Sequence, residues 1–167
     1  ILLGGELDGI VLLTGVGSRM LVEAMFLQHP PEKIHAALQD LPKLCRGPKP
    51  VAYLKTVSMK PTLVAPEPTT WRELIAELDR VEYPLQDKKI AIQEYGESNT
   101  DLEAALRQRG VHVIPIPVYG WKLPEDTTLL ESALQTIANG NADIALFSSA
   151  QQVHNVFTVA KSMHSYD

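Results

Sequence analysis

Short runs of apolar residues alternate along this chain with longer segments in which apolar residues recur at helical spacing. The run at 9–13 is apolar throughout, as expected for a strand that is buried on both faces of a parallel sheet. Strands are also predicted at 44–45, 62–65, 89–93, 111–118 and 143–147, and helices at about 18–28, 32–41, 48–57, 71–78, 100–109, 127–138 and 150–161. This alternation predicts an α/β fold, in which a parallel sheet carries helices on both of its faces.

Polar residues and glycine mark the ends of some of these helices. Thr69 or Thr70 is expected to cap the helix at 71–78, and Glu73 has the spacing from Thr70 that a capping box requires. Gly110 directly follows another helical segment, as expected of a glycine that ends a helix. These signals support the predicted boundaries independently of the apolar pattern.

Two prolines interrupt the predicted strand at 111–118. Pro115 and Pro117 stand in alternate positions and have no N–H group to donate to a neighbouring strand. A central strand is therefore not expected here. The segment is predicted to be an edge strand or a ribbon between domains.

Composition argues against several classes of partner. Net charge is −5 and no cluster of Lys and Arg occurs, so we expect no nucleic-acid surface in this segment. No stretch approaches the roughly 20 apolar residues of a membrane helix, so no membrane partner is expected. The single cysteine, Cys45, cannot form an internal disulfide and is consistent with a cytoplasmic protein. The chain opens without Met and ends in mid-pattern, so we expect a fragment.

The common catalytic and cofactor motifs do not fit. Gly15 and Gly17 follow a strand and open a helix, but Met20 stands where a dinucleotide fingerprint needs a small residue. The five histidines lack the paired helical spacing of a zinc site, and no Gly-x-Ser-x-Gly sequence occurs. Cys45 is interpreted as a small buried side chain rather than a nucleophile. We therefore expect neither a metal nor a cofactor.

Four junctions between a strand and a helix are rich in glycine and hydroxyl groups. In an open α/β sheet such junctions lie at the carboxyl edge, where ligands bind. Each exposes backbone N–H groups at the positive end of a helix dipole, which favours carboxylates or phosphates. Each taken alone is better explained as an ordinary tight turn, and it is the four together that favour a ligand site. The junctions are 14–17, 46–49, 95–98 and 148–151.

The residues of these junctions, in this order, resemble the uroporphyrinogen-III synthase family. The likeness extends over nearly the whole chain, and the order and spacing of the motifs make it specific. They are Leu13-Thr14-Gly15-Val16-Gly17-Ser18-Arg19, Arg46-Gly47-Pro48-Lys49-Pro50-Val51-Ala52-Tyr53-Leu54, Gln93-Glu94-Tyr95-Gly96, Arg109-Gly110-Val111, Pro117-Val118-Tyr119 and Phe147-Ser148-Ser149-Ala150-Gln151-Gln152-Val153.

This resemblance implies a particular domain organisation. Members of the family have two flavodoxin-like α/β domains joined by a two-stranded β-ribbon, because one domain is inserted into the other. By resemblance, 1–112 is the inserted domain, 113–123 belongs to the ribbon, and 124–167 is part of the second domain. The first strands of that second domain lie outside this chain. A monomer is expected.

The resemblance also implies a reaction, the cyclisation of hydroxymethylbilane in tetrapyrrole biosynthesis. The substrate loses its terminal hydroxyl as water and forms an azafulvene, and a spiro intermediate then inverts ring D. Tyr119 is the candidate proton donor, because a neutral phenol can donate at pH 7, although a packing role for Tyr119 is as plausible. The remaining candidate residues would bind the substrate's carboxylates; they are Thr14, Gly15, Gly17, Arg46, Gly47, Lys49, Tyr95, Gly96, Ser148, Ser149 and Gln151.

Two other interpretations stay open. Relatives of this synthase can occur joined to DNA-binding regulators, so the chain could instead be a two-lobed module that senses an anionic small molecule without catalysis. A fragment with no activity of its own is the third possibility. Two departures from the family pattern, Gly15 and Pro50, replace hydroxyl residues of many members. Backbone amides, rather than hydroxyls, are therefore expected to bind at these turns.

Overall fold

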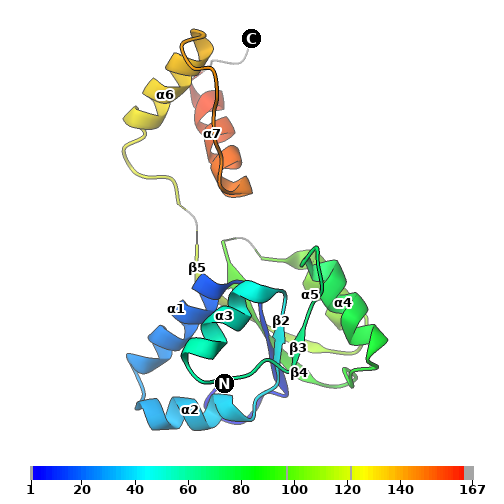
Figure 1. Ribbon diagram of the computed structural model, residues 1–167. Coiled ribbons are helices and arrows are strands. Elements are labelled where there is room, and N and C mark those ends of the chain that lie inside the picture. Colours follow the sequence, from blue (N-terminus) through cyan, green and yellow to red (C-terminus); the bar gives the residue numbers. More distant parts are fainter. Residues whose placement is uncertain (1, 97, 121, 164–167) are drawn as a thin grey trace. The chain divides into compact units, whose positions relative to one another are not determined.

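A computed structural model of the chain describes residues 2–96, 98–120 and 122–163 (Figure 1). Contacts divide the chain into two compact units, Ile1–Gly120 and Trp121–Asp167. Among the described residues, the first unit contains a five-stranded sheet with its helices, and the second contains a pair of helices.

The sheet of the first unit is parallel throughout. Within the described residues its strands are β1 (Gly9–Leu12), β2 (Lys43–Cys45), β3 (Leu63–Val64), β4 (Lys89–Tyr95) and β5 (His112–Tyr119). Every residue of β1 is buried, and so is the middle of β4. Strands that are covered on both faces need apolar residues at successive positions, which explains the continuous run from which β1 was predicted.

Helices cover both faces of the sheet in two groups (Figure 1). One face carries α1 (Gly15–Phe26), α2 (Pro31–Gln39) and α3 (Pro48–Thr56), and the other carries α4 (Trp71–Arg80) and α5 (Thr100–Arg107). Ile10 packs into the core under the first group and Val11 into the core under the second. Successive side chains of a strand point to opposite faces, so β1 contributes to both cores. The predicted α/β fold is confirmed.

The strand order β3-β2-β1-β4-β5 places a topological switch point between β1 and β4. The chain moves outward from β1 to β3, then returns to the other side of β1 to add β4 and β5. Right-handed crossovers in two opposite directions put the helices on opposite faces. Flavodoxin itself has the order 2-1-3-4-5, so the likeness to flavodoxin lies in the layers rather than in the order of strands. Ligands of such sheets bind at the carboxyl ends beside the switch point.

The proline-containing segment forms the edge strand β5, which pairs with β4 from His112 to Tyr119. N–H groups of alternate residues in a strand point to the same side. The N–H groups that Pro115 and Pro117 lack would both face away from β4, so no hydrogen bond between the strands is lost. The predicted edge position is confirmed. This strand lies within the first unit, which extends to Gly120, beyond the boundary expected at residue 112. The role of 113–123 as a connection between domains stays a prediction.

Local signals placed two helix ends correctly. The capping box is present in α4, where the Thr70 backbone N–H donates to Glu73 Oε2 at 2.9 Å. Gly110 has φ +78°, a conformation that glycine adopts without strain. After it, the N–H of Val111 donates to the carbonyl of Leu106 at 3.2 Å, which closes the end of α5.

The strand predicted at 143–147 is wrong. In the second unit α6 (Thr128–Ala138) and α7 (Ala150–Ser162) are helices, but the segment between them is neither helix nor strand. Ile144 and Leu146 are 79% and 92% exposed. A strand needs a neighbour for its backbone N–H and C=O groups, and no strand in the described part of the chain pairs with this segment.

Candidate functional site

Four strands of the first unit end at one edge of the sheet, and each end leads to a predicted site residue. Thr14 lies just beyond the end of β1 and Arg46 directly follows β2, while Tyr95 and Tyr119 are the last residues of β4 and β5. Carboxyl ends of parallel strands meet at the same edge, and these ends lie on both sides of the switch point. Three of the four predicted junctions are thereby brought together.

The junction after β1 opens α1 with two available amides. Thr14 is the N-cap of the helix, and its Oγ1 accepts a hydrogen bond from the Gly17 N–H at 3.0 Å. Gly17 is buried, and its amide is already engaged, so its predicted contact with substrate has no free donor. In the part of the chain that the structure describes, the N–H groups of Gly15 and Val16 have no acceptor. These two amides can donate to a bound anion.

Gln93 fixes this junction, although its place in the family motif predicted no such role. Its side chain is fully buried, and Oε1 accepts from the N–H groups of Leu13 and Thr14, both at 3.3 Å. Its Nε2 donates to the carbonyl of Glu94 at 2.9 Å. Gln93 therefore joins β4 to the end of β1 across the switch point. The available signal was a polar residue that directly follows the apolar run Ile90-Ala91-Ile92.

The starts of α1 and α3 touch each other at Gly15. A Cβ on Gly15 would lie 2.7 Å from the carbonyl oxygen of Lys49, closer than real Cβ contacts, so a glycine allows this approach. Pro48 and Pro50 have no N–H group, which leaves the amides of Gly47 and Lys49 as the donors at this start. A hollow of about 120 Å³ lies here, lined by Leu13, Arg46, Gly47, Pro48, Lys49, Pro50 and Thr69.

The other side of the edge is a corner formed by Arg46 and two tyrosines. Nη1 of Arg46 donates to the Tyr95 hydroxyl at 2.9 Å, and the guanidinium carbon lies 5.6 Å from the centre of the Tyr95 ring. The rings of Tyr95 and Tyr119 have centres 6.3 Å apart and are tilted by 32°. The Gly96 N–H donates to the Tyr119 carbonyl at 2.8 Å. A cation and two phenols are thus held at one place.

The fourth predicted junction belongs to the second unit. Ser149 is the N-cap of α7 and accepts from the Gln152 N–H at 3.3 Å. The N–H and hydroxyl of Ser148 both lie within hydrogen-bond distance of Gln152 Oε1, and Gln151 donates to Asn155 at 3.0 Å. These polar groups are arranged as a helix start, as predicted. A crevice shared with the first unit stays a prediction.

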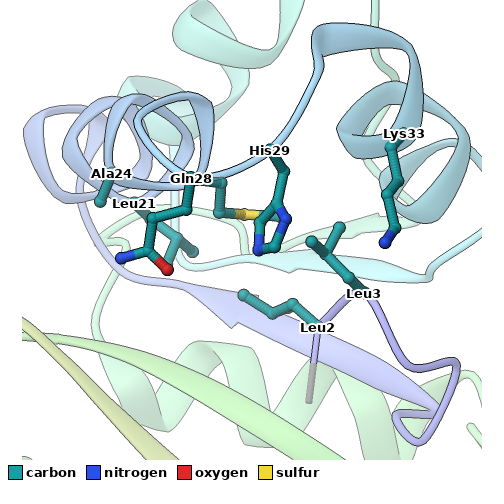
Figure 2. A pocket seen from close by; sticks show the side chains of 8 residues that line it. Leu2, Leu3, Leu21, Ala24, Gln28, His29 and Lys33 are labelled. Carbon is teal, nitrogen blue, oxygen red and sulfur yellow. The ribbon is translucent and has the colours of Figure 1, made fainter.

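A larger hollow of about 430 Å³ lies elsewhere on the first unit (Figure 2). It is lined by Leu2, Leu3, Leu21, Ala24, Met25, Gln28, His29 and Lys33. In Figure 2 the side chains of His29 and Lys33 point toward Leu3. Because α1 runs away from the carboxyl edge, its last turn places this hollow at the opposite end of the sheet. None of the predicted site residues lines it.

The chemistry available at the edge is that of amides, one guanidinium and phenols. No cluster of His, Cys, Asp and Glu that could hold a metal ion occurs among the described residues. Cys45 is fully buried, and burial raises the pKa of its thiol to about 12, so it is a poor nucleophile at neutral pH, as predicted. None of the helices in the described ranges is both long and apolar enough to span a bilayer.

Fold and site together define a class of protein, a doubly wound α/β protein that places backbone amides, an arginine and two tyrosines at the carboxyl edge beside its switch point. Within this class the assignment is specific, because the family model described as Uroporphyrinogen-III synthase HemD matches residues 2–166. The chain belongs to the uroporphyrinogen-III synthase family. The resemblance seen in its motifs is confirmed.

Known relatives give the extent of this likeness. A mutant uroporphyrinogen III synthase from Thermus thermophilus is 29% identical with a TM-score of 0.69, covering 93% of this chain and 57% of that chain. The wild-type enzyme from the same bacterium is 28% identical with a TM-score of 0.62 and the same coverage. The uncharacterized protein YjjA of Bacillus subtilis (strain 168) is 29% identical over 92% of this chain and 56% of its own length. The chain thus spans little more than half of these relatives.

Proposed function

We propose that the full-length protein is a uroporphyrinogen-III synthase, which cyclises hydroxymethylbilane with inversion of ring D and loss of water. Membership of the family supports this proposal. The observation that carries it is the meeting of two helix starts, an arginine and two tyrosines at one carboxyl edge. The proposal has the protein acting as a cytoplasmic monomer without metal or cofactor.

The substrate carries many carboxylates, whereas this chain has a net charge of −5. An acidic protein can still bind an acidic substrate through backbone amides, because a helix start attracts anions without a charged side chain. The amides of Gly15, Val16, Gly47 and Lys49 supply donors at the two touching helix starts. The exposed side chain of Lys49 can add a cation beside them. In this proposal, Ser148, Ser149 and Gln151 of the second unit also bind carboxylates of the substrate.

Conformational control is the larger part of the proposed catalysis. The flexible bilane must be held in the conformer from which the substituted carbon of ring D can attack the azafulvene. Such positioning contributes up to about 7–11 kcal/mol. One proton donor to the departing hydroxyl adds about 10²–10⁴-fold, which is less. Tyr119 is the proposed donor, and the amide of Gly96 holds its backbone in place.

An isomer assay with the full-length protein tests this function. Hydroxymethylbilane is generated enzymatically in the same vessel, and the products are oxidised and separated by chromatography. A synthase gives the type III isomer in excess, while the spontaneous reaction gives type I. Tight binding of the bilane with type I as the only product contradicts the proposal and favours the sensor interpretation.

A further inference from the structure

The hydroxyl of Tyr95 has an unusual combination of partners. It accepts a hydrogen bond from the Arg46 guanidinium at 2.9 Å. Within the described residues its own proton has no acceptor. A phenol has one proton and two lone pairs, so an oxygen that accepts from a cation keeps its proton for another partner. The corner therefore presents a proton at the edge of the sheet.

The Arg46 guanidinium also stabilises the phenolate that Tyr95 becomes after it donates its proton. Hydrogen bonds from a charged donor to a charged acceptor are about twice as strong as neutral ones. Arg46 itself directly follows β2, and its backbone N–H donates to the Leu12 carbonyl at 3.0 Å. Arg46 is thus held in the sheet by its backbone N–H and at Tyr95 by its guanidinium. This arrangement holds the Tyr95 hydroxyl at the edge of the sheet, where its proton can be donated to a bound acceptor.

Tyr95 is placed beside the residue already proposed as donor. Its ring centre lies 6.3 Å from that of Tyr119, and both residues end neighbouring strands. A leaving group within reach of one phenol is therefore close to the other. At Tyr95, a guanidinium donates directly to the phenol oxygen.

We propose that Tyr95 is a second proton donor of the bilane cyclisation and that Arg46 is its positioning residue. This inference rests on the proposed function and names a catalytic residue within the same site. Arg46 then acts mainly through Tyr95, instead of being only a ligand of a substrate carboxylate.

The proposed step is balanced in atoms and electrons. The hydroxyl oxygen of the terminal hydroxymethyl group needs one proton; it takes this proton from Tyr95 while Tyr119 donates a hydrogen bond to the same oxygen, the carbon–oxygen bond breaks, and water leaves. The lone pair of the adjacent pyrrole nitrogen forms a C=N bond while a π pair of the ring forms the exocyclic C=C bond, which gives a protonated azafulvene whose positive charge balances the phenolate. Arg46 stabilises the phenolate of Tyr95 meanwhile. The proton released from ring D carbon when that pyrrole regains its aromaticity returns to the phenolate.

The test compares Tyr95→Phe, Arg46→Met and the double variant in the full-length protein, by initial rates of type III isomer formation. Tyr83→Phe is the matched control, since it removes the same atom from another half-buried tyrosine that lies next to Leu78 and Leu85, outside the site. We expect Tyr95→Phe to lower kcat about 10- to 100-fold with KM changed less than about two-fold. Arg46→Met should cause a similar loss, and Arg46→Lys should recover part of it. The double variant should lose no more than either single one, because both changes remove one function.

Several outcomes overturn the inference. An unchanged kcat in Tyr95→Phe removes this residue from the chemistry. Losses that multiply in the double variant, together with a raised KM in Arg46→Met, show that Arg46 does not act through Tyr95. The latter result makes Arg46 a direct carboxylate ligand. If circular dichroism shows Tyr95→Phe to be unfolded, Arg46→Met decides alone by its kcat and KM. A wild-type protein that forms no type III isomer refutes the proposed function, and the inference with it. An active wild type with a fully active Tyr95→Phe refutes the inference only.

Discussion

Replacing Gly17 by alanine tests the packing at the switch point. A Cβ on Gly17 would lie 2.2 Å from Nε2, 2.4 Å from Cδ and 2.6 Å from Oε1 of Gln93. The Gln93 amide must therefore move. It cannot move freely, because the side chain is fully buried and holds Leu13, Thr14 and Glu94 by hydrogen bonds.

The cost follows from the bonds that are lost. Each hydrogen bond contributes about 0.5–1.5 kcal/mol net, and the buried N–H of Leu13 would be left without an acceptor. Alanine recovers at most about 1 kcal/mol, because it favours a helix more than glycine does. We expect Gly17→Ala to lower the free energy of unfolding by about 2 kcal/mol. For a protein of this size, this is a fall in Tm of roughly 4–8 °C.

Thermal unfolding followed by circular dichroism measures this change in the full-length protein. Gly120→Ala is the control, because a Cβ there meets no atom within 4 Å. Gln93→Ala removes the obstructing amide, so adding Gly17→Ala to it should cost little further stability. A Gly17→Ala protein as stable as the wild type, or a double variant whose losses simply add, would refute this account of the switch point.

Two further predictions concern the site and the acid limit of stability. Tyr119→Phe should lower kcat at least several-fold with nearly unchanged substrate affinity, measured by type III isomer formation beside the Tyr83→Phe control; unchanged turnover would remove Tyr119 from the mechanism. The pKa of Glu103 is lowered by the Ser98 hydroxyl and by Arg107. Its contribution to stability is therefore full above the unfolded pKa and is lost as pH falls through the lower, folded pKa. Glu103→Gln should lower Tm at neutral pH and flatten its decline in acid, and parallel Tm–pH curves for variant and wild type would contradict this.

The elements that carry a local signal could be predicted from sequence. The apolar run of β1, the capping box of Thr70 and Glu73, and Gly110 each depend on nearby residues, and each lies where expected. The edge position of β5 followed from Pro115 and Pro117, because a missing N–H group restricts a strand whatever its partner is.

Features that depend on distant partners could not be predicted. Nothing near Gln93 in the sequence shows that its amide bonds to Leu13 and Thr14, since that contact exists only once β4 lies beside β1. Lys43 is similar: it is buried and donates to the Leu41 carbonyl at 2.7 Å, which its position in a strand does not indicate. The strand predicted at 143–147 was wrong because an apolar pattern forms a strand only where a neighbouring strand can pair with it. The local sequence does not show whether such a neighbour is present.

In the candidate site, too, some features could be predicted from the local sequence and others depend on the fold. The turns themselves were found from glycines and hydroxyls, but the number of available amides depends on contacts between elements. Gly17 donates to Thr14, and Pro48 and Pro50 have no N–H group, so fewer donors remain than the motifs suggested. The pairing of Arg46 with Tyr95 joins residues from two strands and required the fold.

The central claim is that amides at the two touching helix starts bind carboxylates of a bilane. Amide chemical shifts of the ¹⁵N-labelled full-length protein, recorded while the proposed product uroporphyrinogen III is added, test this claim most directly. The account predicts saturable shifts that are largest at Gly15, Val16, Gly47 and Lys49, with Gly17 changed less because its N–H is already bonded to Thr14. Shifts centred instead on His29 and Lys33, at the hollow of Figure 2, would contradict it.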